Sequence, residues 1–283
     1  MLRTRIVTAV VAVCVVLAAL FLLPSRIWGL MALLATVGAA HEWAVLVGLR
    51  ERTWLLFVAG TLAIAFTLLF APSSQFARGW PEGIVLVACG GAALFWLVVA
   101  PVWVIRRWSA RPRVLMALIG WLVLIGAWVA LVELQARSPW LVLAAMAVVW
   151  IADTAAYFTG RAFGRNRLAP QVSPGKTWEG VCGAVASVVV YSLFLVPFAQ
   201  AAGFSLPVDA LTTAGWLVLA AVVAAVSVVG DLYESLLKRQ AGVKDSGRLL
   251  PGHGGILDRL DAQLAALPLL AIAAQLFLTK ASA

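Results

Sequence analysis

Cysteine and histidine are scarce in this chain of 283 residues, which has three of the former and two of the latter. Cys14, Cys89 and Cys182 lie in separate apolar runs, with neither CxxC nor Cys/His spacing. A disulfide framework and a zinc site are therefore not indicated, and we expect the cysteines to be small buried residues.

Charge is also scarce, because charged residues make up 12% of the chain and hydrophobic residues 64%. The mean hydropathy is +1.02, with 13 Trp and 12 Phe. This composition excludes a soluble protein and predicts a polytopic membrane protein. The net charge of +9 does not indicate a nucleic-acid partner, since Lys and Arg gather in cytoplasmic loops and meet the anionic lipid bilayer there.

Nine apolar stretches reach the roughly 20 residues that a helix needs to cross a bilayer. We therefore expect an all-α, polytopic integral membrane protein with about nine transmembrane helices. The first follows the basic segment MLRTR, as in a secretory signal, but it is long and lacks a convincing cleavage site, so we interpret it as retained. The expected spans are Thr4–Leu23, Ile27–Gly48, Thr53–Ala71, Gly83–Ile105, Val114–Gln135, Pro139–Thr159, Trp178–Ala199, Leu211–Tyr233 and Ala262–Lys280.

Basic residues divide unevenly between the two ends of these spans. With nine spans, 17 of the 21 Lys and Arg residues fall on the side of the N-terminus. Because basic loops stay in the cytoplasm, we expect the N-terminus and the richest loops there. Most of the twelve acids lie between Asp153 and Asp261, which divides the chain into a transmembrane scaffold, 1–135, and a catalytic transmembrane region, 136–283, with cytoplasmic loops 160–177 and 234–261.

Asp153 is expected about two turns inside the cytoplasmic end of the sixth span. A carboxylate at that depth costs several kcal/mol unless it meets a cation, water or a metal, which makes Asp153 a functional candidate. A polar contact between helices would explain it equally.

The segment SPGKTWEG, from Ser173, leads into the seventh span. It is not a P-loop, because that motif requires glycine where this chain has Pro170, and a strand where it has a membrane helix. Ser173, Lys176 and Thr177 can still hold a phosphate at a helix N-terminus. Thr177 is also explained as a helix N-cap.

The most polar stretch follows the eighth span. Asp231, Glu234 and Ser235 stand at i, i+3 and i+4 and share one helix face, which Lys238 continues. Glu234 and Lys238 are also explained as an ordinary pair between successive turns. Further polar residues lie among glycines that let backbone N–H groups approach an anion. They are Arg239, Lys244, Asp245, His253, Asp258, Arg259 and Asp261.

Carboxylates from two helices and several cations at one membrane face suit a triphosphate with Mg²⁺. This ion takes one or two carboxylates and completes its shell with phosphate oxygens and water. The second substrate would arrive from the membrane, as a phosphorylated lipid does. Helix capping explains one of Asp258 and Asp261 but not both, and a turn contact also explains His253.

The run S-x-L-K-R-x4-K-D-x-G-x2-L-P-x-H-G-G-I-x-D-R-L-D, from Ser235 to Asp261, resembles the defining motif of the phosphatidate cytidylyltransferases, or CDP-diacylglycerol synthases. The segments SPGKTWEG and WxxDTxAY are similar to this family too. The resemblance implies transfer of the cytidylyl group of CTP to phosphatidate, giving CDP-diacylglycerol and pyrophosphate. It also implies Mg²⁺, a monovalent cation such as K⁺, a homodimer, and a bacterial-type cytoplasmic (inner) membrane with the active site facing the cytoplasm.

In such a reaction the lipid phosphate attacks the α-phosphorus of CTP in line, so positioning and charge neutralisation can provide most of the catalysis. The expected metal ligands are Asp231 and Asp258. The catalytic set adds Asp261, Ser235 and Lys238. The expected substrate-binding residues are Asp153, Ser173, Lys176, Thr177, Arg239, Lys244, Asp245, His253 and Arg259.

Other functions remain open. A transferase acting on another lipid phosphate or alcohol, such as an ether lipid, would carry the same groups. A transporter would explain intramembrane Asp153 and Asp231, although these acids lie toward one face and no repeat is evident. A non-catalytic lipid-binding protein is the third alternative, and it would release no pyrophosphate.

We predict that a cysteine introduced near Arg78 reacts with an impermeant thiol reagent added from outside, whereas one near Arg107 does not. The labelling is measured in intact cells, with permeabilised cells as the control for reactivity. The reverse pattern would contradict the topology.

Overall fold

The computed structural model describes residues 13–70, 79–201, 204–205, 210–249, 254–277 and 279–280. Within these residues, eight helices are long and apolar enough to cross a membrane, counting Glu82–Arg106 as one. The elements are α2 Ser25–Leu46, α3 Glu51–Phe70, α4 Glu82–Leu94, the π-helix η2 Phe95–Val99, α5 Ala100–Arg106, α6 Arg113–Arg137, α7 Pro139–Phe163, β1 Arg167–Ala169, β2 Ser173–Thr177, α8 Trp178–Ala201, β3 Phe204–Ser205, α9 Ala210–Ala241, α10 Leu257–Phe277 and β4 Thr279–Lys280.

The predicted fold class, a polytopic helical membrane protein, is confirmed. Eight of the nine expected spans correspond to these long helices. Of the first expected span, Val13–Leu22 is an apolar helix, and its earlier residues lie outside the described part of the chain. The expected loop around Arg78 lies outside it as well.

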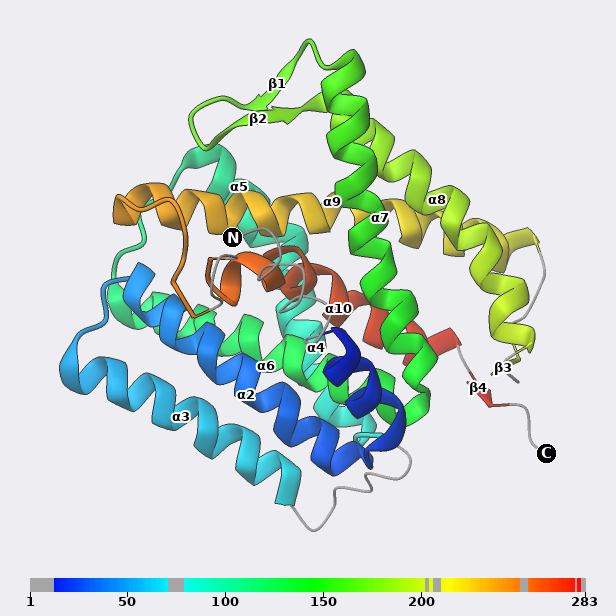
Figure 1. The fold of residues 1–283 in the computed structure, drawn as a ribbon, viewed down its shortest axis with the longest axis horizontal. Helices are drawn as coiled ribbons and strands as arrows, with labels where there is room; N and C mark the ends of the chain where they lie inside the picture. The colour runs from blue at the N-terminus through cyan, green and yellow to red at the C-terminus, as the bar shows by residue number, and fades with distance from the viewer. Residues whose placement is uncertain are drawn as a thin grey trace.

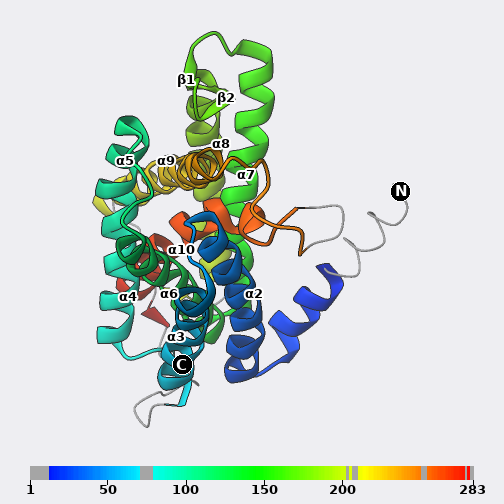
Figure 2. The ribbon, with the colours of Figure 1, turned by 90° about the vertical axis from the view of Figure 1, so that its left-hand side faces the viewer.

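The last four long helices pack in pairs (Figures 1 and 2). α7 runs alongside α8, and α9 packs along α10 while crossing α7 at a steep angle. α2 and α10 both pack on α6, which joins the two halves of the chain. The hairpin of β1 and β2 extends from the ends of α7 and α8 at the edge of the molecule, over one end of α5 and α9 (Figure 1).

An aromatic cluster fixes α9 against the first half of the chain. The ring of Tyr233 is fully buried and contacts Trp43 of α2, Phe95 and Trp96 of η2, and Trp103 of α5, at centroid distances between 5.4 and 6.2 Å. Aromatic pairs at these distances contribute beyond the area that they bury. Tyr233 therefore fixes the position of its turn of α9. The same turn carries the polar residues that lie on either side of Tyr233 along the helix.

The expected span Gly83–Ile105 is not a uniform α-helix. Phe95–Val99 forms a π-turn, and Pro101 follows in the first turn of α5. Proline has no N–H to donate and its ring crowds the carbonyl four residues earlier, so a widened turn before it relieves the clash.

Two expected loops contain regular structure. α9 continues through residues 234–241, because Leu236 and Leu237 are buried, and it ends at Gly242, whose φ of +73° suits a helix C-terminus. There the N–H of Val243 donates to the carbonyl of Lys238 at 3.0 Å. In the expected loop 160–177, β1 and β2 pair antiparallel, with Arg167 opposite Thr177.

The expectation of buried cysteines holds for Cys89 alone. Cys14 and Cys182 are exposed on the protein surface. Lipid tails are as apolar as a protein core, so a small apolar side chain loses little by facing them.

Candidate active site

The two helices that carry the polar stretch come closest at Gly230. A Cβ at this position would lie 2.6 Å from the carbonyl oxygen of Asp261 and 2.9 Å from the Cβ of Ala265, so only glycine permits the contact. The next residue, Asp231, therefore lies at the junction of α9 and α10, and its charge interacts with that of Asp261. Carboxylates from two helices therefore face one another here, and their roles stay a prediction.

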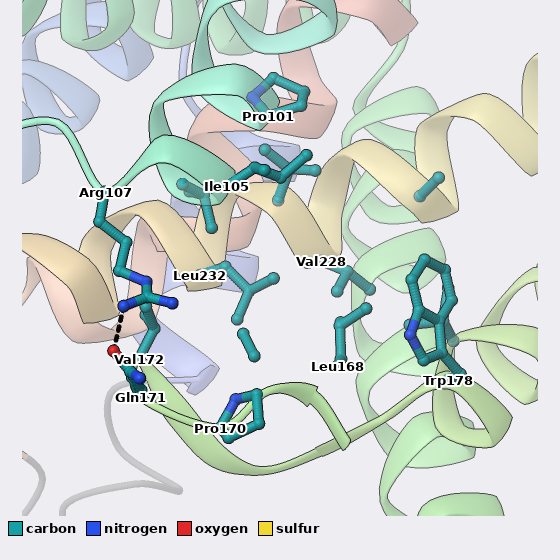
Figure 3. Close-up of a pocket in the computed structure, with 15 residues that line it drawn as sticks. Pro101, Ile105, Arg107, Leu168, Pro170, Gln171, Val172, Trp178, Val228 and Leu232 are labelled. Carbon is teal, nitrogen blue, oxygen red and sulfur yellow. Dashed lines mark hydrogen bonds between the residues drawn. The ribbon is translucent and has the colours of Figure 1, made fainter. Parts of the chain in front are cut away.

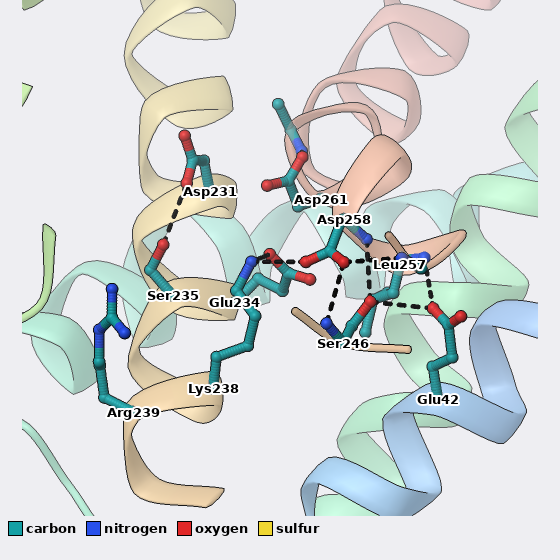
Figure 4. Close-up of polar contacts among 12 residues, drawn as sticks. Glu42, Asp231, Glu234, Ser235, Lys238, Arg239, Ser246, Leu257, Asp258 and Asp261 are labelled. Atoms are coloured by element: carbon teal, nitrogen blue, oxygen red, sulfur yellow. Dashed lines mark hydrogen bonds and ion pairs between the residues drawn. The ribbon is translucent and has the colours of Figure 1, made fainter. Parts of the chain in front are cut away.

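Lys238 joins the same two helices one to two turns further on. Its Nζ lies 2.6 Å from Oε2 of Glu234 on α9 and 2.6 Å from Oδ1 of Asp258 on α10 (Figure 4). Glu234 is 3% exposed, and a buried carboxylate without a counter-charge would be strongly destabilising. Lys238 is thus a bridge between α9 and α10 in this structure.

Asp258 also organises the chain that leads into α10. Its Oδ2 accepts the N–H groups of Ser246 at 2.9 Å and Gly255 at 2.8 Å, and its own N–H donates to Ser246 Oγ at 3.2 Å. Both of its carboxylate oxygens are therefore engaged by the protein.

The hairpin reaches this site through Lys176. Its Nζ lies 2.6 Å from Oδ2 of Asp231, whose Oδ1 accepts the hydroxyl of Ser235 at 3.2 Å. Asp153 of α7 interacts electrostatically with both Lys176 and Asp231. The structure thus brings together polar residues of α7, the hairpin, α9 and α10.

The start of α8 explains the place of Thr177. Its Oγ1 accepts the N–H of Gly180 at 3.1 Å, as an N-cap does, and the residue is buried. Glu179 accepts the side-chain amide of Asn166 at 2.9 Å, which ties the hairpin to the helix. The capping interpretation of Thr177 is supported, while its expected contact with substrate stays a prediction.

The remaining expected residues lie around this cluster. Arg239 is exposed, and its Nε donates to the carbonyl of Val172 at 3.4 Å. Lys244, Asp245 and Arg259 are exposed, and Ser173 begins β2 and is half-buried. His253 lies outside the described residues.

The chain matches known proteins along nearly its whole length. The sequence pattern described as the cytidylyltransferase family matches residues 3–277. A protein of Pseudomonas aeruginosa named phosphatidate cytidylyltransferase is 40% identical over 279 residues, 96% of each chain. The chain belongs to the phosphatidate cytidylyltransferase family.

Other relatives have the same name. One from Haemophilus influenzae is 34% identical over 95% of this chain and 96% of its own. One from Brucella suis is 49% identical over 133 residues, which are 46% of this chain and 45% of the relative. The family resemblance inferred from the motif between Ser235 and Asp261 is confirmed.

The acidic groups of this family member fit a magnesium ion shared with a phosphate substrate. No group of three or more His, Cys, Asp or Glu residues within the described ranges is arranged to hold a metal by itself. Mg²⁺ needs one or two carboxylates when phosphate oxygens and water complete its shell. Asp231 and Asp261, adjacent across the helix junction, supply that number of hard oxygen ligands.

Glu42 of α2 is the residue that the sequence analysis missed. It is 1% exposed and accepts three hydrogen bonds from the first residue of α10 and the chain before it: Ser246 Oγ at 3.0 Å, Ile256 N–H at 3.1 Å and Leu257 N–H at 2.8 Å (Figure 4). A side chain on either Gly247 or Gly255 would clash with it. The signal was present, because Glu42 is an acid within an apolar span, the argument applied to Asp153.

Replacing Glu42 by Ala should lower both stability and activity. Three buried donors would lose their acceptor, at a cost on the order of 1–3 kcal/mol for each group left unpaired. We expect an unfolding midpoint well below that of the wild type, measured by tryptophan fluorescence in detergent, and a large loss of turnover. Glu42→Gln keeps one acceptor oxygen and should fall between the two.

Glu82→Ala is the matched control, since Glu82 is exposed in the first turn of α4. It should match the wild type in both measurements. Wild-type stability and turnover of Glu42→Ala would show that the three hydrogen bonds do not order the site.

Proposed function

We propose that this protein transfers the cytidylyl group of CTP to phosphatidate, releasing pyrophosphate and leaving CDP-diacylglycerol in the membrane. The full-length similarity to two proteins named phosphatidate cytidylyltransferase supports this function. The observation that carries it in the structure is the meeting of Asp231, Asp261 and Lys176 at the junction of three elements. Such a cluster can bind phosphates together with a metal ion.

The reaction joins one oxygen of the lipid phosphate to the α-phosphorus of CTP and breaks the bond to the β-phosphate. The attacking phosphate is already anionic, so no strong general base is required. The protein has to align two anions that repel each other and neutralise the charge that passes to pyrophosphate. Lys176 and Lys238, which form ion pairs with Asp231 and Asp258, are cations that serve that purpose in this proposal.

Mg²⁺, when bound, would neutralise the triphosphate and polarise the α-phosphoryl group. We propose that Asp231 and Asp261 hold it. The expected second ligand, Asp258, accepts two backbone N–H groups of the chain that leads into α10, whereas both partners of Asp231 are side chains that can turn away. The role of Asp258 in this proposal is therefore to order the start of α10. The monovalent cation implied by the resemblance stays a prediction.

Lys176 can serve two partners in this proposal. Its ammonium group pairs with Asp231 in the structure. Once Asp231 has another counter-charge, the ammonium group is available to a phosphate at the N-terminus of α8, where the helix dipole also favours an anion.

The distribution of basic residues supports a location of this site on the cytoplasmic side of a bacterial-type cytoplasmic membrane, with the N-terminus on the same side. A homodimer is part of the proposal on the basis of the family resemblance. The division into a scaffold and a catalytic region stays a prediction, and Glu42 is a contact between the two.

The direct test is pyrophosphate release by the purified protein with CTP, Mg²⁺ and phosphatidate in mixed micelles, with CDP-diacylglycerol identified as the lipid product. We expect turnover that stops when a chelator is added and resumes with excess Mg²⁺. An ether-linked lipid phosphate and a lipid alcohol, tested in parallel, distinguish the acceptor. Absence of pyrophosphate release with every acceptor would overturn the proposal and favour transport or lipid binding.

Replacing Asp231 or Asp261 by Asn should lower turnover by about 10²–10³-fold, the loss typical of one electrostatic group at a reaction centre. The Mg²⁺ concentration for half-maximal rate should rise if the residue holds the ion. Asp258→Asn should instead lower the unfolding midpoint together with turnover, because it weakens the bridge to Lys238.

Glu51→Gln, an exposed acid at the start of α3, is the control and should leave rate, Mg²⁺ dependence and stability unchanged. A normal Mg²⁺ dependence in Asp261→Asn, combined with a shifted one in Asp258→Asn, would return the second metal position to Asp258.

A further inference from the structure

A partly open apolar cavity of about 420 Å³ lies beside the site and is lined by α5, the hairpin, α8 and α9 (Figure 3). This volume is within the range of ligand-binding pockets in proteins. Its walls are hydrocarbon for most of their extent. They include Val104, Ile105, Leu168, Val181, Val228 and Leu232.

The cavity and the acidic cluster of Asp231 and Asp261 share α9 and the hairpin as walls. On α9 its lining ends at Leu232, the residue after Asp231. On the other side it is lined by Trp178, two residues after Lys176. The ion pair between Lys176 and Asp231 therefore lies next to the cavity, on the same two elements.

The charged and amide side chains that line the cavity lie at one end. Arg107, at the end of α5, donates to the side-chain oxygen of Gln171 on the hairpin (Figure 3). Outside the lining, Arg239 donates to the neighbouring carbonyl of Val172. From there the lining follows α9 from Leu232 to Ala225, which spans about 10 Å at 1.5 Å per residue. Cations at one end and hydrocarbon beyond them complement an anionic head group on an apolar chain.

The apolar lining disfavours CTP, the other substrate of the proposed reaction, as the occupant of the cavity. A nucleotide base carries several donors and acceptors, and a buried polar group without a partner is costly. Beyond Arg107 and Gln171, the side chains that line this cavity carry a single polar group, the indole N–H of Trp178.

We infer that this cavity holds the part of one acyl chain of phosphatidate that lies nearest to the head group, with Ala225 and Val228 as its floor. This inference rests on the proposed function and adds a chain-binding subsite to it. The phosphate of the lipid would then lie at the end of the cavity that Leu232 and Arg107 form, next to Asp231 and its partner Lys176, and the chain would run along α9 toward Ala225.

Filling the cavity tests the inference. Ala225→Phe places a ring in the cavity, and Ala214→Phe, on an exposed position of the same helix, is the matched control. KM and kcat are measured with dipalmitoyl and dihexanoyl phosphatidate at equal mole fractions in one detergent. For Ala225→Phe we expect KM for the dipalmitoyl lipid to rise on the order of tenfold, because the ring and the chain compete for the same packed space, with a much smaller rise for the dihexanoyl lipid. The control should change neither.

Each other outcome overturns the inference. Equal losses with both lipids would mean that the ring damages the site, and unchanged kinetics with both would mean that no chain enters the cavity. If Ala225→Phe does not fold, Ala225→Leu makes the same comparison with a smaller side chain. Wild-type protein that turns over neither lipid would overturn the proposed function instead, so the two failures are distinguishable. A change in particle size caused by Ala225→Phe would identify the cavity as a contact between copies of the chain.

Discussion

A carboxylate buried among membrane helices needs a counter-charge or hydrogen-bond donors, and the site depends on how this constraint is met. Glu234 and Asp258 share one ammonium group, that of Lys238. Glu42 is stabilised by three hydrogen-bond donors from the first residue of α10 and the chain before it. Removal of Lys238 or Glu42 leaves several buried polar groups without their partner, so these contacts fix α2, α9 and α10 together.

The fold was largely predictable because hydropathy depends on local composition, and every long described helix coincides with an apolar run of the sequence. The face of α9 with Asp231, Ser235 and Lys238 was predictable for a similar reason, since i, i+3 and i+4 positions align on any helix. The partners across helices were not predictable. They depend on the close contact at Gly230, which is set by packing and not by any spacing along the chain.

The contacts of Glu42 and the structure of the hairpin were not predictable from the sequence either. Glu42 lies more than 200 residues from the donors that it accepts from, so no local pattern connects them. The hairpin has an irregular register between Arg167 and Ala169, and proline and glycine in β2 conceal its strand character. In both places the sequence supplied the residue types, and the tertiary contacts determined what they do.

The arrangement also explains how one helix can serve two substrates of opposite polarity. Successive residues of α9 point in directions about 100° apart, so Asp231 can face the acidic cluster while Leu232 lines the apolar cavity. Tyr233, the next residue, lies in the aromatic cluster that holds this turn in place. Three consecutive side chains thus have three roles: Asp231 belongs to the charged site, Leu232 to the wall of the cavity and Tyr233 to the aromatic cluster. A rigid turn of this kind would bring a triphosphate in water and the phosphate of a lipid in the membrane together. The triphosphate would stay on the aqueous side, and the lipid chains would stay in the hydrocarbon.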